Sequence, residues 1–427
     1  MKQLIIILLL GCGLCAGAQQ LNTNAPQYAL NTNAPANAMA SADGQITASV
    51  TQPEEGDVSK TFSRAFAIDQ SDKISVSNQF GSITIKTWDK REVKAEVSIR
   101  AFSSSDAKKL LDQVVIEAGK AGDLVTFKTR IDEENSRWGN FIRNGRKSRQ
   151  EVKVDYVIYM PATNALTVSQ QYGNVTMGDF DAALSAKVQY GNLIVGKLSS
   201  SNNYLSVQYG KMNVAEATKA TIKHQYGAGV VLGTIGTLNL NAQYTKVDIT
   251  SITGEAVIEQ QYGQGLTIGS VGSLNLDAQY IKVKIGSVKR NGAIVNQQYG
   301  SLDITSVGSI KVDAQYTGVN IGQLNGDASF NMQYNNLIIG TVGEGVKRLT
   351  ADCEYVSMSF NFAERYNANV DVQTSYASFR FGAGVSAKLT GDDEDRSSRE
   401  KNYVGKIGSG GTNVVRIKAE YGSVTFK

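Results

Sequence analysis

The sequence predicts an all-β fold: a single-stranded parallel β-helix, or solenoid, with rungs of roughly 18 residues. First, a Gln-Tyr pair recurs along the chain, and nearly all steps between the tyrosines are 17 to 19 residues. Second, apolar and polar residues alternate on both sides of each pair, as in half-buried strands. Third, each repeat is too short to bury its own apolar face, so repeats must stack. The tyrosines of this series are at positions 172, 190, 209, 226, 244, 262, 280, 299, 316, 334, 355, 376 and 421.

The first 18 residues predict a secretory signal peptide that is cleaved before Gln19. Lys2 precedes an apolar run from Leu4 to Leu10, and Ala16-Gly17-Ala18 supplies the small residues of a cleavage site. Lipoprotein processing at Cys12 is the alternative. The apolar run is too short to span a bilayer, and no later segment approaches the ~20 apolar residues of a membrane helix. We therefore expect a chain without a transmembrane segment, exported to the periplasm, the outer-membrane surface or the extracellular space.

The composition argues against a nucleic-acid-binding protein and against a protein stabilised by internal disulfides. Loss of Lys2 with the signal peptide lowers the formal net charge from +4 to +3, which is close to neutral and argues against a nucleic-acid-binding protein. Cys12 and Cys15 also leave with the signal peptide, so Cys353 is the single remaining cysteine and has no internal disulfide partner. Stability must then come from packing.

Residues 19–60 are interpreted as a disordered tether. They contain Leu-Asn-Thr-Asn-Ala-Pro twice, at Leu21 and Leu30, and then a run of mainly small and polar residues. Little apolar surface is available here to offset the entropy of ordering.

Residues 61–160 predict an N-terminal cap region of strands around one helix. The segment 77–85, Ser-Asn-Gln-Phe-Gly-Ser-Ile-Thr-Ile, contains the repeat motif with Phe80 in the tyrosine position. Ser103–Ala118 has apolar residues at helical spacing and is predicted to be the helix. Leu124–Ile131 and Val152–Met160 are predicted strands.

Two charged segments are interpreted as solvated loops. The first, 132–150, could instead contact an anionic polysaccharide or lipid headgroup through Arg143, Arg146, Lys147 and Arg149. The second, 391–402, contains four adjacent acids at 392–395, but their spacing lacks the alternating ligands and central Gly of a calcium loop.

Residues 161–427 are predicted to be stacked rungs. The residue four before each tyrosine is apolar and should line the interior, whereas the residue three before it is polar and should face water, as Glu259, Asp277, Asn296 and Asp313 do. The interior positions are Val168, Ala186, Leu205, Ile222, Leu240, Ile258, Leu276, Val295, Val312 and Phe330. The last rung, 414–426, is expected to cap the open end of the stack.

Stacking should turn the repeated pair into two ladders. Strand alternation places the tyrosine rings inside and the preceding glutamines outside, and it also points Gln170, Gln260 and Gln297 inward. Gln-Tyr-Gly copies alternate with Ala-Gln-Tyr copies about 36 residues apart, which indicates duplication of a two-rung unit.

No catalytic, cofactor-binding or metal-ligating residue is assigned. His224 is the single histidine, and it occupies a repeat position that Val188, Ala242 or Gln260 fills in other copies. A Ser-His-Asp or Cys-His site would need it beside named partners. We interpret it as a structural residue.

The chain resembles the bacterial putative-adhesin family, which consists of exported β-strand-repeat domains. Three features over residues 62–427 carry the resemblance: the 77–85 motif followed by Trp-Asp-Lys-Arg-Glu-Val, the helical Ala-Lys-Lys-Leu-Leu-Asp-Gln-Val, and the repeated Tyr-Gly-x-Val/Leu-x-Ile. The resemblance implies a right-handed single-stranded parallel β-helix in the envelope or outside the cell, without catalytic residues.

Three functions remain open. The favoured one is a non-enzymatic surface or envelope protein that binds an unknown glycan or an envelope or host protein. The second is a polysaccharide lyase or hydrolase, for which Glu259 and Asp277 on adjacent rungs would be roughly 5 Å apart, a spacing compatible with a retaining glycosidase. The third is a structural envelope scaffold, with or without self-association.

Overall fold

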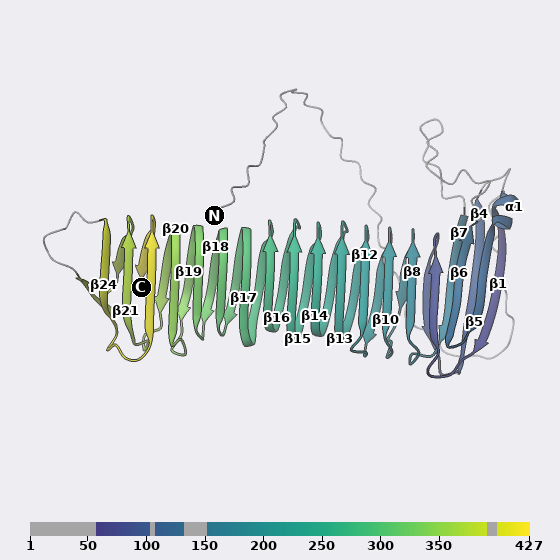
Figure 1. Cartoon of the computed structure of the whole chain (residues 1–427), viewed down its shortest axis with the longest axis horizontal. Coiled ribbons are helices and arrows are strands. Elements are labelled where there is room, and N and C mark those ends of the chain that lie inside the picture. Colours follow the sequence, from purple (N-terminus) through teal and green to yellow (C-terminus); the bar gives the residue numbers. More distant parts are fainter. Residues whose placement is uncertain (1–56, 103–106, 132–151, 391–398) are drawn as a thin grey trace, which may run out of the picture. The chain divides into compact units, whose positions relative to one another are not determined.

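The computed structural model describes residues 57–102, 107–131, 152–390 and 399–427, which form an all-β solenoid with one short helix. Figure 1 shows the strands of its central part side by side in chain order. The predicted signal peptide, both charged loops except residues 399–402, and residues 19–56 lie outside the described residues. The first strand, β1 (Asp57–Ala67), already includes residues that were assigned to the tether.

The coil consists of parallel strands paired at one-turn offsets. Leu166 pairs with Leu184, and Leu184 with Asn203, in a register that continues through the stack. From β13 onward each long strand bends around a corner. The strands of the coil are β8 (Leu166–Gln171), β9 (Val175–Met177), β10 (Leu184–Gln189), β11 (Leu193–Leu198), β12 (Asn203–Gln208), β13 (Lys211–Gln225), β14 (Gly229–Gln243), β15 (Lys246–Gln261), β16 (Gly265–Gln279), β17 (Lys282–Val307), β18 (Ile310–Leu324), β19 (Ala328–Val342) and β20 (Arg348–Phe362).

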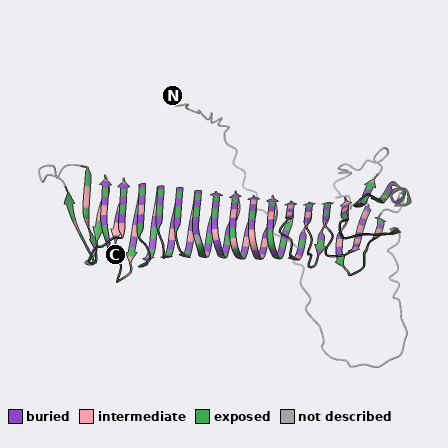
Figure 2. Ribbon diagram, turned by 60° about the horizontal axis from the view of Figure 1, so that its bottom comes forward, coloured by how far each residue is buried: buried purple, intermediate pink, exposed green. Residues whose placement is uncertain are grey.

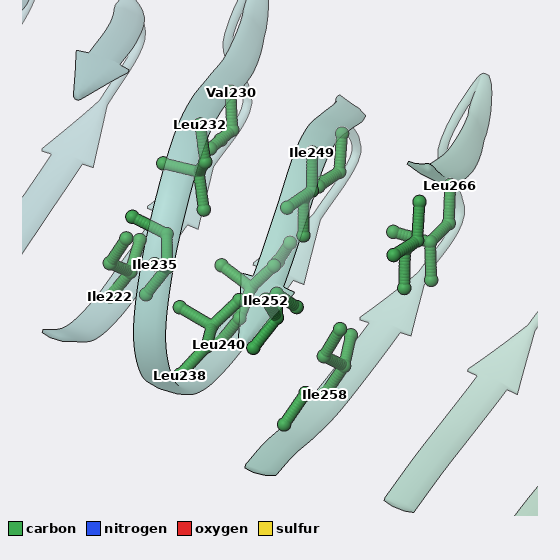
Figure 3. Packing of buried hydrophobic residues seen from close by; sticks show 14 of the residues in the cluster. Ile222, Val230, Leu232, Ile235, Leu238, Leu240, Ile249, Ile252, Ile258 and Leu266 are labelled. Carbon is green, nitrogen blue, oxygen red and sulfur yellow. The ribbon is translucent and has the colours of Figure 1, made fainter. Parts of the chain in front are cut away.

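The core is one continuous column of aliphatic side chains inside the coil. Buried positions alternate with exposed or half-buried ones along the straight parts of the coil's strands (Figure 2). Leu238, Leu240, Ile249 and Ile252 point into the same interior from successive sides of one turn, and Ile258 follows on the next (Figure 3). All ten interior positions predicted from the sequence are buried, and the polar positions three residues before the tyrosines are not. The period-two prediction is therefore confirmed for the straight parts of the strands.

The two-rung period has a packing cause. Where the residue two before the tyrosine is a long inward amide, the residue after the tyrosine is Gly; where it is Ala, a larger residue follows. At Gly300 an added Cβ would lie 2.8 Å from Gln297 Nε2 and 1.9 Å from Ile281 O. In alternate turns Ala278 is followed by Ile281, and both are buried. The residue two before the tyrosine and the residue after it share one interior volume. A close-packed core has room for a large side chain at only one of these two positions in each rung, so the large side chain changes position from rung to rung.

The inward glutamines are hydrogen-bonded within this corner. Gln260 Nε2 donates to Thr245 O and to Gly265 O, both at 3.1 Å. Gln297 Nε2 donates to Ile281 O at 3.1 Å and to Ser301 O at 3.0 Å. Each buried amide thus connects its own turn with the turn before it, which lowers the cost of burying a polar group.

The N-terminal region adds strands to the first turn. β2 (Lys73–Asn78) and β3 (Ile83–Thr87) pair in parallel with β8 and β9, so the 77–85 segment is the first turn of the coil. On their other side lie β6 (Leu124–Ile131) and β7 (Val152–Met160), whose bounds match the predicted strands. β4 (Glu92–Phe102) joins β7 antiparallel, β1 joins β4, and β5 (Val114–Ala121) joins β6.

The predicted helix is shorter than expected. Within the described residues α1 covers Ala107–Gln113, residues 103–106 lie outside them, and Val114–Ala118 belong to β5 instead. The run Val114-Val115-Ile116 is β-branched, which favours an extended strand, and it pairs antiparallel with Ile131, Arg130 and Thr129 of β6. For residues 114–118, hydrogen bonding to the free edge of β6 outweighs the helix tendency that their apolar spacing indicates.

The last rung lies inside the stack rather than at its end. β25 (Val414–Glu420) pairs in parallel with β20 on one side and with β21 (Ala368–Ser375) on the other. β26 (Ser423–Phe426) likewise lies between β20 and β22 (Ser378–Phe381). The end of the stack is formed instead by β24 (Glu400–Ile407), antiparallel to β21, and by β23 (Val385–Thr390), antiparallel to β24. The expectation of a capping last rung was therefore wrong: the chain doubles back to fill a gap between earlier turns.

Deletion of residues 412–427 should destabilise the C-terminal turns strongly. It removes five core side chains, Val415, Ile417, Ala419, Val424 and Phe426, and each large one contributes roughly 1.5–3 kcal/mol on burial. We expect a loss above about 5 kcal/mol in denaturant unfolding and rapid proteolysis after Phe362. Addition of the synthetic peptide 412–427 should restore resistance.

The matched control is deletion of residues 19–34, a segment of equal length in the predicted tether. Equal unfolding midpoints for the two deletions would contradict the inserted position of the last rung.

Candidate interaction surface

Each repeat tyrosine sits at a corner in the left-handed backbone region. All thirteen have φ between +49° and +59°. This conformation costs roughly 1–2 kcal/mol for an L-residue and is usually left to Gly. It also interrupts the alternation of the strand, so that the glutamine and the tyrosine after it both point outward.

The rings are therefore outside the coil, contrary to the expectation from strand alternation. Their exposed fractions lie between 37% at Tyr172 and 48% at Tyr280. The inward direction of Gln170, Gln260 and Gln297 is confirmed, because these residues precede the corner.

The tyrosines form one continuous stack along the coil, here called the tyrosine ladder and defined as the thirteen tyrosines of the repeat together with Phe80. Neighbouring ring centroids are 4.6 to 5.4 Å apart with interplanar angles of 1° to 15°. The inserted last rung takes its place in it, since Tyr421 stacks between Tyr355 and Tyr376. At such separations parallel rings are in contact when they are offset, a favoured aromatic arrangement.

Stacking determines which part of each ring a ligand can reach. Both faces of an internal ring are covered by its neighbours, so the exposed part is the ring edge with its hydroxyl. At the last turn the outer face of Tyr376 is covered as well: the Arg399 guanidinium lies 5.0 Å from the ring centroid and donates a hydrogen bond to the hydroxyl. The ladder offers a row of edges and hydroxyls, not platforms for flat stacking.

A ladder of amides runs beside the rings. Gln171 Nε2 donates to Gln189 Oε1 at 3.2 Å, and Gln189 to Gln208 at 3.4 Å. The series continues from Gln208 to Gln225 at 3.0 Å and from there to Gln243 at 3.3 Å. The predicted outward glutamine ladder is confirmed in direction, and over these turns its members are half-buried.

A third column, two residues further back on the same face, carries carboxylates and amides from Asn241 onward, and Ser or Lys in the four turns before it. Glu259 and Asp277 are paired in register on adjacent strands, and both are exposed, as the sequence predicted. Asn241 Nδ2 donates to Glu259 Oε2 at 2.7 Å, and Asn331 Nδ2 to Asp313 Oδ2 at 3.2 Å. A hollow of about 230 Å³ opens on this face, lined by Asp277, Ala278, Asn296, Gln297, Gln298, Asp313 and Gln315. The surface is a flat, hydrogen-bonding strip with a ridge of ring edges along one side.

His224 is buried in the inward position that Gln260 has in another turn. Its Nε2 lies 3.1 Å from Gly210 O, and burial lowers the pKa of the imidazole to about 4. The side chain is therefore neutral near pH 7 and packs in the core, as predicted. Cys353 is buried too, and burial raises the pKa of its thiol to about 12, so it is not a reactive thiolate.

Two charged clusters singled out in the sequence cannot be located. The basic cluster at 143–149 and the acids at 392–395 lie outside the described residues. Within the described ranges, no group of three or more His, Cys, Asp or Glu side chains is arranged to hold a metal ion. In that same part of the chain, no helix has the length and apolarity to cross a membrane.

Comparison with known proteins gives only distant likenesses. No protein-family model matches the chain, and neither does any curated protein. Among solved structures, a putative cell adhesion protein from Clostridium sporogenes is 10% identical, with 87% of this chain and 99% of the other covered and a TM-score of 0.17. A putative adhesin from Bacteroides fragilis is 10% identical over 86% and 97% of the two chains, with a TM-score of 0.22. A putative adhesin from Parabacteroides distasonis is 11% identical over 87% and 98%, with a TM-score of 0.19. Likenesses at this level support no conclusion about function.

Tyr209→Ala should cost roughly 1–3 kcal/mol of unfolding free energy. It removes the stacks on Tyr190 and Tyr226 and leaves a Cβ-bearing residue in the left-handed conformation. Gln208→Ala should cost about 1 kcal/mol, since it removes two amide hydrogen bonds of 3.4 and 3.0 Å. Denaturant unfolding measures both. The control, Tyr209→Phe, keeps the ring and should stay within about 0.5 kcal/mol of the native chain; a loss as large as that of the alanine variant would contradict stacking as the source.

His224 should make the stack sensitive to acid. Its folded pKa of about 4 is below the unfolded value of about 6.5, so the unfolded chain binds the proton more readily. Stability is then complete above pH 6.5 and falls on the order of 1 kcal/mol per pH unit as the pH drops toward 4. Unfolding midpoints at pH 7 and pH 5 measure this loss. His224→Gln places in this slot the residue found at position 260 and should remove that part of the loss. An identical pH dependence in the variant would rule out His224 as its cause.

Proposed function

We propose that this chain is an exported, non-enzymatic, adhesin-like protein of the cell envelope or surface, and that its ladder face binds a linear glycan lying along the coil. In this proposal residues 1–18 direct export, the following stretch tethers the β-solenoid, and the coil is right-handed. The observation that carries the proposal is the repetition of outward tyrosines and glutamines, with a column of other polar residues beside them, at the spacing of the rungs.

The chemistry of the columns suits sugar hydroxyls. Amides can both donate to and accept from sugar hydroxyls, carboxylates accept from them, and the phenol hydroxyls of the tyrosine ladder can do both. Each contact with an exposed group is weak by itself. A polymer that meets many equivalent groups gains through effective concentration, because every further contact is intramolecular. A repeating face is best matched by a repeating ligand.

A partner protein is the main alternative occupant. Tyrosine edges are frequent at protein interfaces, but hot spots of such interfaces cluster in a local patch. The ladder face is uniform over many turns and has no such centre. Hydrolysis or lyase chemistry at Glu259 and Asp277 would need a water-excluding site that tunes an acid and a base, whereas the strip on which this pair lies is open.

Affinity for oligosaccharides should increase steeply with chain length. Calorimetric titration with a length series of neutral and acidic glycans should show weak binding of disaccharides and at least about tenfold tighter binding of long oligomers. The combined change of Tyr262, Tyr280 and Tyr299 to Phe retains the stack and removes three hydroxyls, so it should weaken long-oligomer binding about tenfold or more at roughly 1 kcal/mol per hydrogen bond.

The matched control is Tyr403→Phe, which removes a hydroxyl from β24, outside the ladder. Binding that does not depend on length, or that survives the triple variant unchanged, would contradict the proposal. Tight binding of an envelope protein in place of any glycan would favour the alternative.

A further inference from the structure

A second hollow lies at a different corner, beside the first turn of the coil. Its volume is about 710 Å³, within the range of small-molecule sites. It is formed by three chain segments that are far apart in the sequence: 68–70 before β2, 87–91 between β3 and β4, and 161–164 between β7 and β8, with Asp181 beside them. It contains no residue of the tyrosine ladder.

Trp88 is the aromatic group of this hollow. Its indole Nε1 donates to Glu92 O at 2.8 Å, and its ring stacks on Tyr159 with centroids 5.3 Å apart. These two contacts hold the orientation of the ring. The Lys90 ammonium lies 4.9 Å from the ring centroid. Lys90 is exposed, so a ligand can displace it from the ring.

Asn164 supplies a polar group at the wall of the hollow. The side chain is 2% exposed, and its Nδ2 donates to Asp69 O at 2.7 Å and Asp72 O at 2.9 Å. Its Oδ1 accepts no hydrogen bond from the residues that the structure describes. The two donated bonds fix the side chain at the wall of the hollow, so the oxygen is a pre-oriented acceptor for a ligand hydroxyl.

The charged groups around the hollow are mixed in sign. Asp69, Asp89 and Asp181 provide carboxylates, and Lys90 and Arg91 provide cations. None of these five side chains forms an ion pair within the described part of the chain. Such a lining favours neither a strongly anionic nor a strongly cationic ligand. It does match a neutral, polyhydroxylated ring, whose hydroxyls can use both acceptors and donors.

We propose that this Trp88 hollow is a discrete binding site for a single neutral sugar unit. The apolar face of the sugar lies on the indole in place of Lys90, and its hydroxyls bind Asn164 Oδ1 and the carboxylates of Asp69 and Asp89. Because its platform is a ring face, the site differs in kind from the ladder, where stacking covers the ring faces. The inference does not depend on glycan binding by the ladder.

Trp88 can report its own occupation. The chain contains two tryptophans, so Trp138→Phe leaves Trp88 as the sole indole. Titration of this variant with the methyl glycosides of glucose, galactose, mannose and N-acetylglucosamine should give a saturable change in emission at millimolar concentration for at least one of them. Asp89→Ala should weaken this binding severalfold, whereas Lys90→Ala should strengthen it because the ring face is then open. The combined Tyr-to-Phe variant of the ladder should leave it unchanged.

Trp88→Ala removes the platform and should abolish binding measured by calorimetry, with circular dichroism to confirm the fold. Absence of saturation with all four glycosides, or binding unaffected by Lys90→Ala and Asp89→Ala alike, would overturn the proposal. A response only to a lysine-rich peptide would overturn it also, in favour of a cation site. If the ladder fails to bind oligosaccharides, the expected results for the Trp88 hollow do not change, because the two sites are tested separately.

Discussion

The parallel register at the tyrosine corner is the constraint on which the rest of the structure depends. A left-handed tyrosine costs roughly 1–2 kcal/mol, and each aromatic pair returns roughly 0.5–1.5 kcal/mol. Every internal ring has two neighbours, so there is about one stack for each strained residue, and the two effects nearly balance. The balance holds only while successive corners stay aligned. A slip of one residue would leave the strain and lose the stacks, so the corner enforces the register of the strands.

The corner also determines what the interior can hold. The residue after the tyrosine lies directly above a carbonyl of the previous turn, where an added Cβ at Gly263 would lie 2.1 Å from Thr245 O. Turns with an inward Gln therefore use Gly, and their neighbours combine Ala with Thr or Ile. This alternation keeps the interior volume constant and ties each turn to the next by amide-to-carbonyl hydrogen bonds. A two-rung unit, not a single rung, is the unit of packing.

The straight parts of the coil could be predicted from the sequence because period two fixes the face of every strand residue. The prediction failed for the tyrosine rings because strict alternation was extended through the corner, where the positive φ of the tyrosine interrupts it. It failed for 114–118 because helical spacing in a short window is weaker than an available strand partner.

The position of the last rung could not be predicted from the local pattern. Ile417 and Ala419 are compatible with any neighbouring strand, and only the gap between β20 and β21 determines where their strand pairs. The Trp88 hollow was missed since its walls come from three separate turns.

The inserted last rung changes how the stack ends. If residues 414–426 were the final turn, they would present a parallel edge and an uncovered tyrosine face, which is a template for a second copy of the chain. Insertion moves Tyr421 inside the tyrosine ladder and makes Tyr376 its last member. The chain then covers that end: β24 runs antiparallel to β21, which breaks the parallel register, and Arg399 occupies the outer ring face. One segment therefore replaces the parallel edge by an antiparallel one and covers the last ring face. The repetitive face along the side of the coil remains exposed, because the rings of the tyrosine ladder lie outside the coil and not at its end.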